Sequence, residues 1–400
     1  MLRIHRFIPA SSLVLFSCWM SSLQAETNDK LQFSGFARVI AGYLNEEHGT
    51  FLGYDDSISF TEQTLLGLQL DYQVMDNLSV TGQAVARTAD DSDSGIEWLY
   101  LTYTPSNAWK FKIGRQRTPI FNYSDIIDVG FAYPWISLPQ QVYRGFLFPT
   151  YEGLQSQYEY VGKNISLGLE AYIGGIEREF VANGQVLDTD IDNLRGIVGT
   201  VGYQGWNFRA SYHRGHADIN QPELNAFSNQ LRQFGFMQSA DSIKTDGVGR
   251  FYQISAFYED VDYFFRTELM QIKADLSLSP KTKGYFISGG LNFYPVSVYL
   301  SISKDTNRYL QPVAEIPTGI NAQLDALAFG YQQTFSQSQD NSTLSYTAGI
   351  RWDWQENLAL KAEATLLKEN EGTQGLFTTR DVNNFDGQAI LYQVAMEWVF

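Results

Sequence analysis

The sequence is poor in cysteine and histidine, with one cysteine and four histidines in 400 residues. Cys18 precedes the expected mature chain, which would therefore need neither disulfides nor a reducing compartment. Only His48, His213 and His216 follow it, and no Gly-x-Ser-x-Gly, His-Glu-x-x-His or phosphate-binding glycine motif occurs. We therefore predict no catalytic residues, no metal and no cofactor.

Long apolar runs are also missing, since no segment of the mature chain approaches the roughly 20 apolar residues that a membrane-spanning helix needs. The chain begins with two arginines, an apolar stretch over residues 12–20 and the small residue Ala25, a pattern typical of a secretory signal. We predict a signal peptide over residues 1–25. A lipoprotein signal that acylates Cys18 is the alternative, although Phe16 is bulky for that role.

Basic residues are scarce, with 28 Lys and Arg against 44 Asp and Glu. Removal of Arg3 and Arg6 with the signal changes the formal net charge from −16 to −18. This balance disfavours nucleic acid as a partner and weakly favours cations. The total charge says nothing about the local field inside a pore.

What the sequence does contain is strict alternation of apolar and polar residues, clearest at the carboxyl end. Residues of one parity there are apolar, whereas Gln393 and Glu397 occupy the other parity. The apolar set is Ile390, Tyr392, Val394, Met396, Trp398 and Phe400. The whole alternating segment, residues 390–400, has eleven residues. This length matches the roughly 9–11 residues that a tilted strand needs to cross a membrane. A membrane barrel has this pattern because alternate residues face lipid and water.

Similar segments recur along the chain and predict sixteen strands. They are residues 32–43, 60–74, 78–89, 95–104, 109–116, 151–161, 165–174, 192–203, 206–216, 248–260, 262–273, 283–294, 297–305, 343–354, 358–369 and 388–400. Short turns alternate with long connectors, as in membrane barrels, and the long ones include 116–150, 217–247, 306–342 and 370–387. We predict an all-β fold, a closed antiparallel transmembrane β-barrel over residues 26–400.

Residues 321–335 form one further apolar segment, with apolar residues at helical spacing of three and four. A seventeenth strand would give an odd number, whereas bacterial single-chain barrels have even numbers. We therefore predict a short helix in the seventh outer loop.

Three segments resemble the Gram-negative outer-membrane porin superfamily: Lys112–Pro119, Asp128–Trp135 and Arg351–Glu363. The resemblance covers residues 26–400. It implies a homotrimer of sixteen-stranded barrels in the cell outer membrane, each with its own pore, in contact with lipid and lipopolysaccharide. Terminal Phe400 resembles the aromatic end that such proteins present to the barrel assembly machinery.

The resemblance also implies that the third outer loop, 116–150, folds inward as a constriction. A physical argument agrees, because a loop of this length with so many aromatic residues would be poorly solvated. A ring of opposed charges at such a narrowing would set selectivity. The candidates for this constriction are Arg38, Arg87, Arg115 and Arg117 on the wall and Asp125 and Asp128 on the loop.

Strand parity supports Arg38 and Arg87 as lumenal residues. Arg115 shares parity with apolar Phe111 and Ile113, so it would face the lumen only if Gly114 formed a bulge. Each arginine could instead form a rim salt bridge of little energetic value. The loop lacks the Pro-Glu-Phe-Gly-Gly pattern of general enteric porins, which weakens the transfer of Asp125 and Asp128.

The function that fits best is a porin, a water-filled channel for passive diffusion of ions and small hydrophilic solutes. The alternatives are a substrate-selective channel for sugars or small organic acids, and a barrel-anchored receptor or adhesin. The acidic loop 90–95 lacks the last carboxylate of a calcium loop. It is either a solvated loop or a place where divalent ions bridge to lipopolysaccharide.

Overall fold

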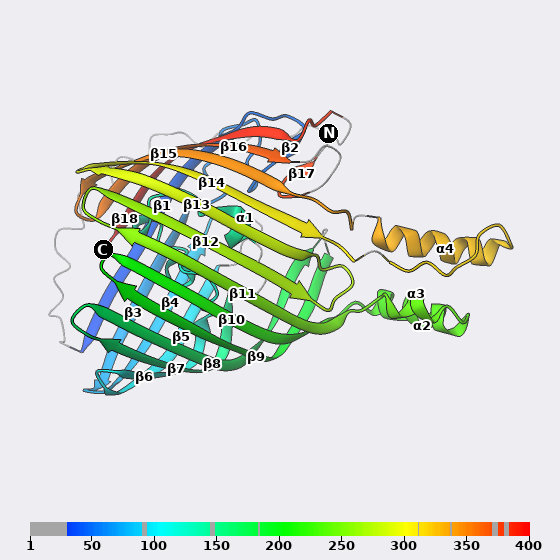
Figure 1. The fold of residues 1–400 in the computed structure, drawn as a ribbon, viewed down its shortest axis with the longest axis horizontal. Coiled ribbons are helices and arrows are strands. Elements are labelled where there is room, and N and C mark those ends of the chain that lie inside the picture. The colour runs from blue at the N-terminus through cyan, green and yellow to red at the C-terminus, as the bar shows by residue number, and fades with distance from the viewer. Residues whose placement is uncertain are drawn as a thin grey trace, which may run out of the picture.

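A computed structural model describes residues 30–89, 94–144, 149–182, 185–310, 312–336, 338–369, 375–379 and 384–400. The predicted signal peptide and most of the acidic loop 90–95 lie outside these ranges. Within them, sixteen strands form one closed antiparallel barrel (Figure 1). They are β1 (Leu31–Leu44), β3 (Leu65–Met75), β4 (Leu78–Arg87), β5 (Gly95–Ser106), β6 (Trp109–Arg117), β7 (Thr150–Val161), β8 (Ile165–Ala182), β9 (Gln185–Tyr203), β10 (Trp206–Ile219), β11 (Asp246–Glu259), β12 (Tyr263–Ala274), β13 (Lys281–Phe293), β14 (Val296–Arg308), β15 (Thr343–Gln355), β16 (Leu358–Glu369) and β18 (Gln388–Val399).

The barrel closes where β1 pairs with β18, from Phe36 opposite Val399 to Leu44 opposite Leu391. Tyr392, Val394 and Met396 on β18 are exposed on the outer face, whereas the residues between them point inward. The alternation that the sequence shows therefore divides a lipid-facing surface from a lumen. All sixteen predicted strands are confirmed.

The two ends of the barrel differ. Tight turns such as residues 76–77 and 204–205 join strands at one end, which we call the turn end. Long connectors join them at the other end, the loop end. The predicted bounds are wrong at β8 and β9, which also include residues 175–182 and 185–191 and extend past the neighbouring strands as a paired hairpin (Figure 1).

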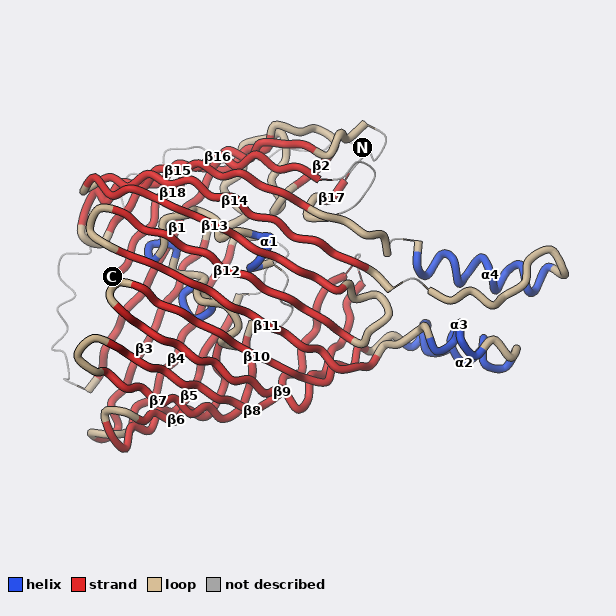
Figure 2. The backbone as a smooth tube through the Cα atoms, in the orientation of Figure 1, coloured by secondary structure: helices blue, strands red, loops and turns tan. Residues whose placement is uncertain are grey.

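Helices project from the loop end (Figure 2). The β10–β11 connector holds α2 (Pro222–Gln233) and α3 (Met237–Asp241), and neither helix was predicted from the sequence. The predicted helix of the seventh loop is α4 (Ala322–Phe335), and the Asn321 side chain caps it by accepting two backbone N–H groups. Leu231, Leu327 and Tyr331 join these helices in one apolar cluster. Among the described residues, no helix is long and apolar enough to cross a bilayer.

The connector between β6 and β7 lies inside the barrel over its described residues, 118–144 and 149, and we call this part the inner loop. It contains two 3-10 turns, η1 (Ser124–Ile126) and η2 (Gly130–Ala132), and the short helix α1 (Gln140–Tyr143). Figure 1 shows α1 within the ring of strands. A second covering forms at the loop end, where β2 (Gly49–Thr50) pairs with β17 (Thr378–Thr379).

Candidate pore constriction

Aromatic packing fixes the inner loop to one side of the barrel wall. The loop contributes Phe121, Tyr123, Tyr133, Trp135 and Tyr143 to a buried cluster. The wall contributes Phe251, Phe264, Met270, Phe286 and Tyr299, which come from β11 to β14. The ring centres of Trp135 and Phe286 lie 5.6 Å apart in an edge-on arrangement. These contacts pack the loop against the inner face of β11–β14.

A buried lysine also holds the inner loop. Lys361 on β16 points inward, and its Nζ donates to the carbonyl oxygens of Gly130, Tyr133 and Trp135 at 2.7–2.8 Å. The same Nζ lies 2.5 Å from a carboxylate oxygen of Glu397 on β18, and both side chains are fully buried. A Cβ atom on Gly130 would lie 2.2 Å from the other Glu397 oxygen. Only glycine lets the loop backbone approach this pair so closely.

Other wall residues hydrogen-bond the loop backbone in the same manner. Arg351 donates to the carbonyl oxygens of Phe131 and Tyr133 at 2.6 and 3.1 Å. Glu363 accepts the backbone N–H of Ile136 at 3.0 Å and the hydroxyl of Tyr299 at 2.6 Å. The irregular loop backbone cannot pair in the sheet, so these charged groups satisfy it instead.

The loop is fixed at its start by Arg209 and Glu268. Arg209 donates to the carbonyl oxygens of Pro119 and Ile120. Glu268 accepts the backbone N–H of Asn122 at 3.3 Å and the hydroxyl of Tyr143 at 2.7 Å. Hydrogen bonds to charged groups are the stronger ones, so the loop position is well determined.

On the opposite side, the loop meets β4–β6 through a charged cluster. Asp128 of the loop accepts hydrogen bonds from Arg117 at 2.6 Å and Arg87 at 3.0 Å. Glu97 pairs with Arg87 at 2.7 Å and lies 3.7 Å from Arg117. Although burial alone would raise the pKa of the Asp128 carboxyl, the two guanidinium groups hold that pKa below its ordinary value.

This cluster borders a chamber of about 390 Å³ between the inner loop and the wall. Its charged lining residues are Arg38, Arg87, Arg117, Arg178, Glu97 and Asp128. The Arg38 guanidinium donates to the Gln63 carbonyl oxygen at 2.8 Å and lies 3.4 Å from the Tyr133 hydroxyl. The described lining residues therefore include four guanidinium groups but only two carboxylates.

The structure brings together four of the six candidate constriction residues: Arg38, Arg87, Arg117 and Asp128. The prediction that Arg115 belongs to the constriction is wrong. The β5–β6 pairing passes Gly114 without a shift of register, so Arg115 keeps the outward parity and pairs with Glu152 at 2.7 Å on the outer face. Asp125 is exposed on η1 and does not line the chamber.

Several important residues were not among the candidates. Glu97 and Arg178 line the chamber, and Lys361 and Arg351 anchor the loop. Lys361 alternates with Leu360 and Ala362, so its inward parity was visible in the sequence. Its partner Glu397 was not, because β16 and β18 are separated by a long connector whose register the sequence does not give.

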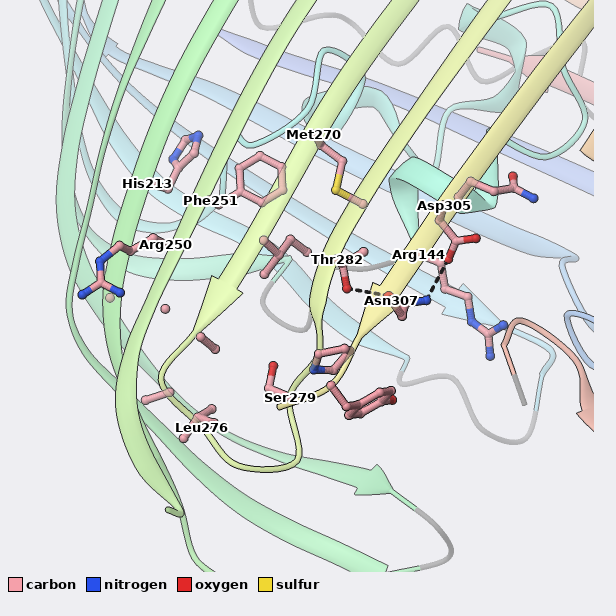
Figure 3. Close-up of a pocket in the computed structure, with 18 of the residues that line it drawn as sticks. Arg144, His213, Arg250, Phe251, Met270, Leu276, Ser279, Thr282, Asp305 and Asn307 are labelled. Atoms are coloured by element: carbon pink, nitrogen blue, oxygen red, sulfur yellow. Dashed lines mark hydrogen bonds between the residues drawn. The ribbon is translucent and has the colours of Figure 1, made fainter. Parts of the chain in front are cut away.

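A second chamber, of about 410 Å³, lies nearer the loop end (Figure 3). Much of its lining is apolar and includes Ile191, Leu194, Ile219, Phe251, Met270 and Leu276. Polar groups gather on the other side, where Asn307 accepts the Thr282 hydroxyl at 2.6 Å and donates to Asp305 at 3.0 Å (Figure 3). Arg144 also lines this side. A lumen wall with so many apolar residues is unusual, because barrel interiors are mostly polar.

Phe400 lies at the turn end beside the first strand. Its backbone N–H donates to the Gly35 carbonyl at 2.9 Å, and the Gly35 N–H donates to the Phe400 carbonyl at 2.8 Å. Its ring is about half exposed and lies 6.3 Å from that of Phe33. The terminal residue therefore completes the seam between β1 and β18.

Comparison with known proteins gives similarity in structure only. No protein-family model matches the sequence, and no curated protein matches it. A loop-deletion mutant of OmpT, an outer membrane protein of Vibrio cholerae, has a TM-score of 0.56 and 12% identity over 92% of this chain and 99% of that chain. OmpF of Salmonella typhi, solved with daunomycin, gives 0.56 and 12% over 92% and 97%.

An anion-selective porin from Comamonas acidovorans has a TM-score of 0.52 and 10% identity, over 92% of this chain and 99% of that chain. These identities are too low to carry over function. What the likeness shows is the fold: this chain forms a sixteen-stranded barrel of the kind found in porins and other outer-membrane proteins.

Proposed function

We propose that this protein is a porin, a non-enzymatic channel of the Gram-negative outer membrane for small hydrophilic solutes. The observation that carries the proposal is the position of the inner loop. Wall residues anchor the loop on one side, and the charged chamber lies between the loop and the wall on the other side. A loop held in this way narrows a lumen and places fixed charges along the solute path. Similarity to an anion-selective porin and to OmpF supports this function.

The chamber supports a preference for small anions at the constriction. Four guanidinium groups and two carboxylates line it, and such charges act strongly on ions where the path is narrow. This local excess of positive charge opposes the negative net charge of the whole chain. The local field decides because ions in the constriction lie within a Debye length of it.

The test is a reversal-potential measurement in planar bilayers under a potassium chloride gradient. We expect Arg38→Ala together with Arg178→Ala to move the reversal potential toward cation preference while channels still form. Lys163→Ala with Lys368→Ala removes the same charge from exposed sites outside the chamber and should leave the potential unchanged. An equal shift in both double variants would contradict the proposed selectivity, and a folded protein without conductance would contradict the porin.

The apolar chamber in Figure 3 favours a substrate-selective channel as the second candidate. A sugar or small organic acid has an apolar face for Leu194 and Ile219 and polar groups for Arg144 and Asp305. Blocking of ion current by such solutes, reduced in Leu194→Ser, would support this candidate. Unchanged current at millimolar solute would contradict it.

We also propose the remaining properties that the resemblance implies. Residues 1–25 direct export, the loop end faces outward, and three copies assemble into a homotrimer in contact with outer-membrane lipid. Phe400 serves as the signal to the assembly machinery. Deletion of Phe400 should lower the amount of heat-modifiable, folded protein in outer-membrane fractions, and an unchanged amount would contradict that role.

A further inference from the structure

A buried histidine in the apolar chamber has a ring nitrogen without a partner. His213 on β10 lines this chamber beside Phe251, with the two ring centres 5.7 Å apart (Figure 3). The His213 side chain is only 2% exposed. Its Nδ1 lies 2.8 Å from the Tyr172 hydroxyl, but among the described residues Nε2 has no hydrogen-bond partner. His213 therefore keeps one unused hydrogen-bonding position inside the protein.

The wall beside His213 leaves room for the imidazole. Gly196 on β9 lies opposite His213, and a Cβ atom there would collide with Nδ1 and with the ring of Tyr172 on β8. A glycine is needed where side chains approach the backbone this closely. The pair of rings is therefore held in a fixed place, with Nδ1 turned toward β8 and β9.

A second buried polar atom lines the same chamber from the inner loop. Gln141 of α1 is 3% exposed, and its Oε1 accepts the Ser303 hydroxyl at 2.7 Å. Within the described part of the chain, its Nε2 has no hydrogen-bond partner. Buried polar atoms without a partner are destabilising, and native proteins retain few of them unless water or a ligand satisfies them. Two such atoms in one chamber therefore indicate a ligand with hydrogen-bonding groups.

Polar groups on the other side of the chamber already have partners. Asn307 donates to Asp305 at 3.0 Å and to Asn341 at 2.8 Å. Arg144 donates to the Leu376 carbonyl oxygen at 2.6 Å, and its positive charge interacts with Asp305. The unused hydrogen-bonding capacity therefore lies with the histidine and the glutamine rather than with these charged groups.

The surface around the two unused atoms is apolar. Ile191, Leu194 and Ala217 form one part of it, and Phe251 and Met270 form another. The chamber volume of about 410 Å³ lies within the range of roughly 300–1,000 Å³ that is usual for small-molecule sites. Such sites combine apolar walls with a few polar groups that orient the ligand. The chamber has this composition.

We propose that this chamber binds an uncharged phenol-type compound, which is a small aromatic ring with a hydroxyl group. A hydroxyl both donates and accepts, so it pairs with Nε2 in either tautomer of His213 and can also accept from Gln141. The ring of the ligand packs against Phe251 and Met270, because aromatic edges and thioether sulfur make favourable contacts with aromatic rings. This inference rests on the proposed porin function, since the ligand reaches the chamber from the loop end of an open barrel.

Other classes of solute match the chamber less well. A sugar carries many hydroxyls, and most of them would face the apolar wall without a partner. A carboxylate only accepts hydrogen bonds, so it fits one tautomer of His213, and the charge of Arg144 is already shared with Asp305. An inorganic ion would lose its water against apolar side chains. The ligand class therefore differs from the sugars and organic acids of the second candidate function.

The experiment is a fluorine NMR titration of the purified, folded protein in detergent at neutral pH, where a phenol is uncharged. The probes are 4-fluorophenol, fluorobenzene and 4-fluorobenzoate, with glucose as a competitor and protein-free detergent as the blank. We expect 4-fluorophenol to bind about tenfold more tightly than fluorobenzene, because only the phenol satisfies a buried polar atom.

The variant His213→Phe keeps a ring but removes Nε2. It should weaken binding of 4-fluorophenol about tenfold and change binding of fluorobenzene by less than about twofold. The matched control is His216→Phe on the same strand. His216 faces outward, because the adjacent Ala217 belongs to the apolar cluster inside the barrel. This control should bind both probes as the parent does.

Equal affinity of the parent for 4-fluorophenol and fluorobenzene would overturn the proposal. An equal loss of both probes in His213→Phe would also overturn it, because His213 would then only support the shape of the chamber. Tighter binding of 4-fluorobenzoate, or displacement of the phenol by millimolar glucose, would assign the chamber to another class of solute. If His213→Phe does not fold, Gln141→Leu gives the same comparison. The titration needs no ion current, so its failure is distinct from a failure of the proposed porin function.

Discussion

Replacement of Lys361 by methionine tests whether the inner loop depends on buried charge. Methionine fills similar space but donates no hydrogen bond. The loop carbonyls at Gly130, Tyr133 and Trp135 would lose the hydrogen bond from Lys361, and Glu397 would lose its cation. Since neither side chain of the pair reaches solvent, water cannot easily replace the lost hydrogen bonds and ion pair.

The magnitude follows from the burial of the pair. Removing one partner of a buried ion pair costs about 3–5 kcal/mol, because the other charge remains buried and unpaired. At 1.4 kcal/mol for each factor of ten, the population of barrels with an undocked loop should rise by about 10²–10⁴. Lys361→Met with Glu397→Gln loses the same three hydrogen bonds from the charged donor, at about 1.5–3 kcal/mol each, but leaves no buried carboxylate unpaired. The double variant should therefore be the more stable of the two.

The assay combines single-channel recording with limited proteolysis of the folded protein. We expect Lys361→Met to give larger, noisier conductance steps and new cleavage within residues 118–149, with partial recovery in the double variant. Lys368→Met lies on the same strand but is exposed, and should behave as the parent. Parental conductance and protease resistance in Lys361→Met would refute the reasoning.

Three further predictions follow from the same geometry. Arg115→Ala should leave selectivity unchanged and lower the free energy of unfolding by no more than about 1 kcal/mol, because its ion pair is exposed; a shifted reversal potential would return Arg115 to the lumen. Asp128 has a lowered pKa, so its ion pairs persist above its ordinary pKa of 3.8 and are lost only as pH falls through the lower folded value; the change in reversal potential that Asp128→Asn causes should therefore be the same at pH 7 and at pH 5. Excision of α2, α3 and α4 together should preserve conductance, because they project beyond the barrel, and its loss would contradict this.

The number and order of strands could be predicted because lipid imposes a strict pattern. Wherever a strand contacts the membrane, one parity must be apolar, and the sixteen segments were found on that basis. The predicted strands of the β8–β9 hairpin were too short. The end of this hairpin, with Asp188, Asp190 and Asp192, extends to where no lipid enforces alternation. Helix α2 was missed although Pro222 stands at its first turn, a common position for proline in a helix.

The constriction was predictable in part for the same reason. Arg38 and Arg87 lie within alternating segments, so parity placed them in the lumen, and it also argued against Arg115. Parity does not apply to Arg117, where the strand ends and the chain turns inward. The partnership of Lys361 and Glu397 required the register between two strands, and that register depends on tertiary pairing.

The charged side chains inside this barrel have two separate tasks, and their positions divide accordingly. On β10–β18, Arg209, Glu268, Arg351, Lys361 and Glu363 satisfy backbone or hydroxyl groups of the inner-loop region. Around β1–β8, the arginines that include Arg38 and Arg178 line the chamber. Loss of a charge of the first kind should alter pore size and stability, whereas loss of one of the second kind should alter ion preference with little change in stability. A selectivity change without instability in a wall variant of the first kind would show that the two tasks are not separate.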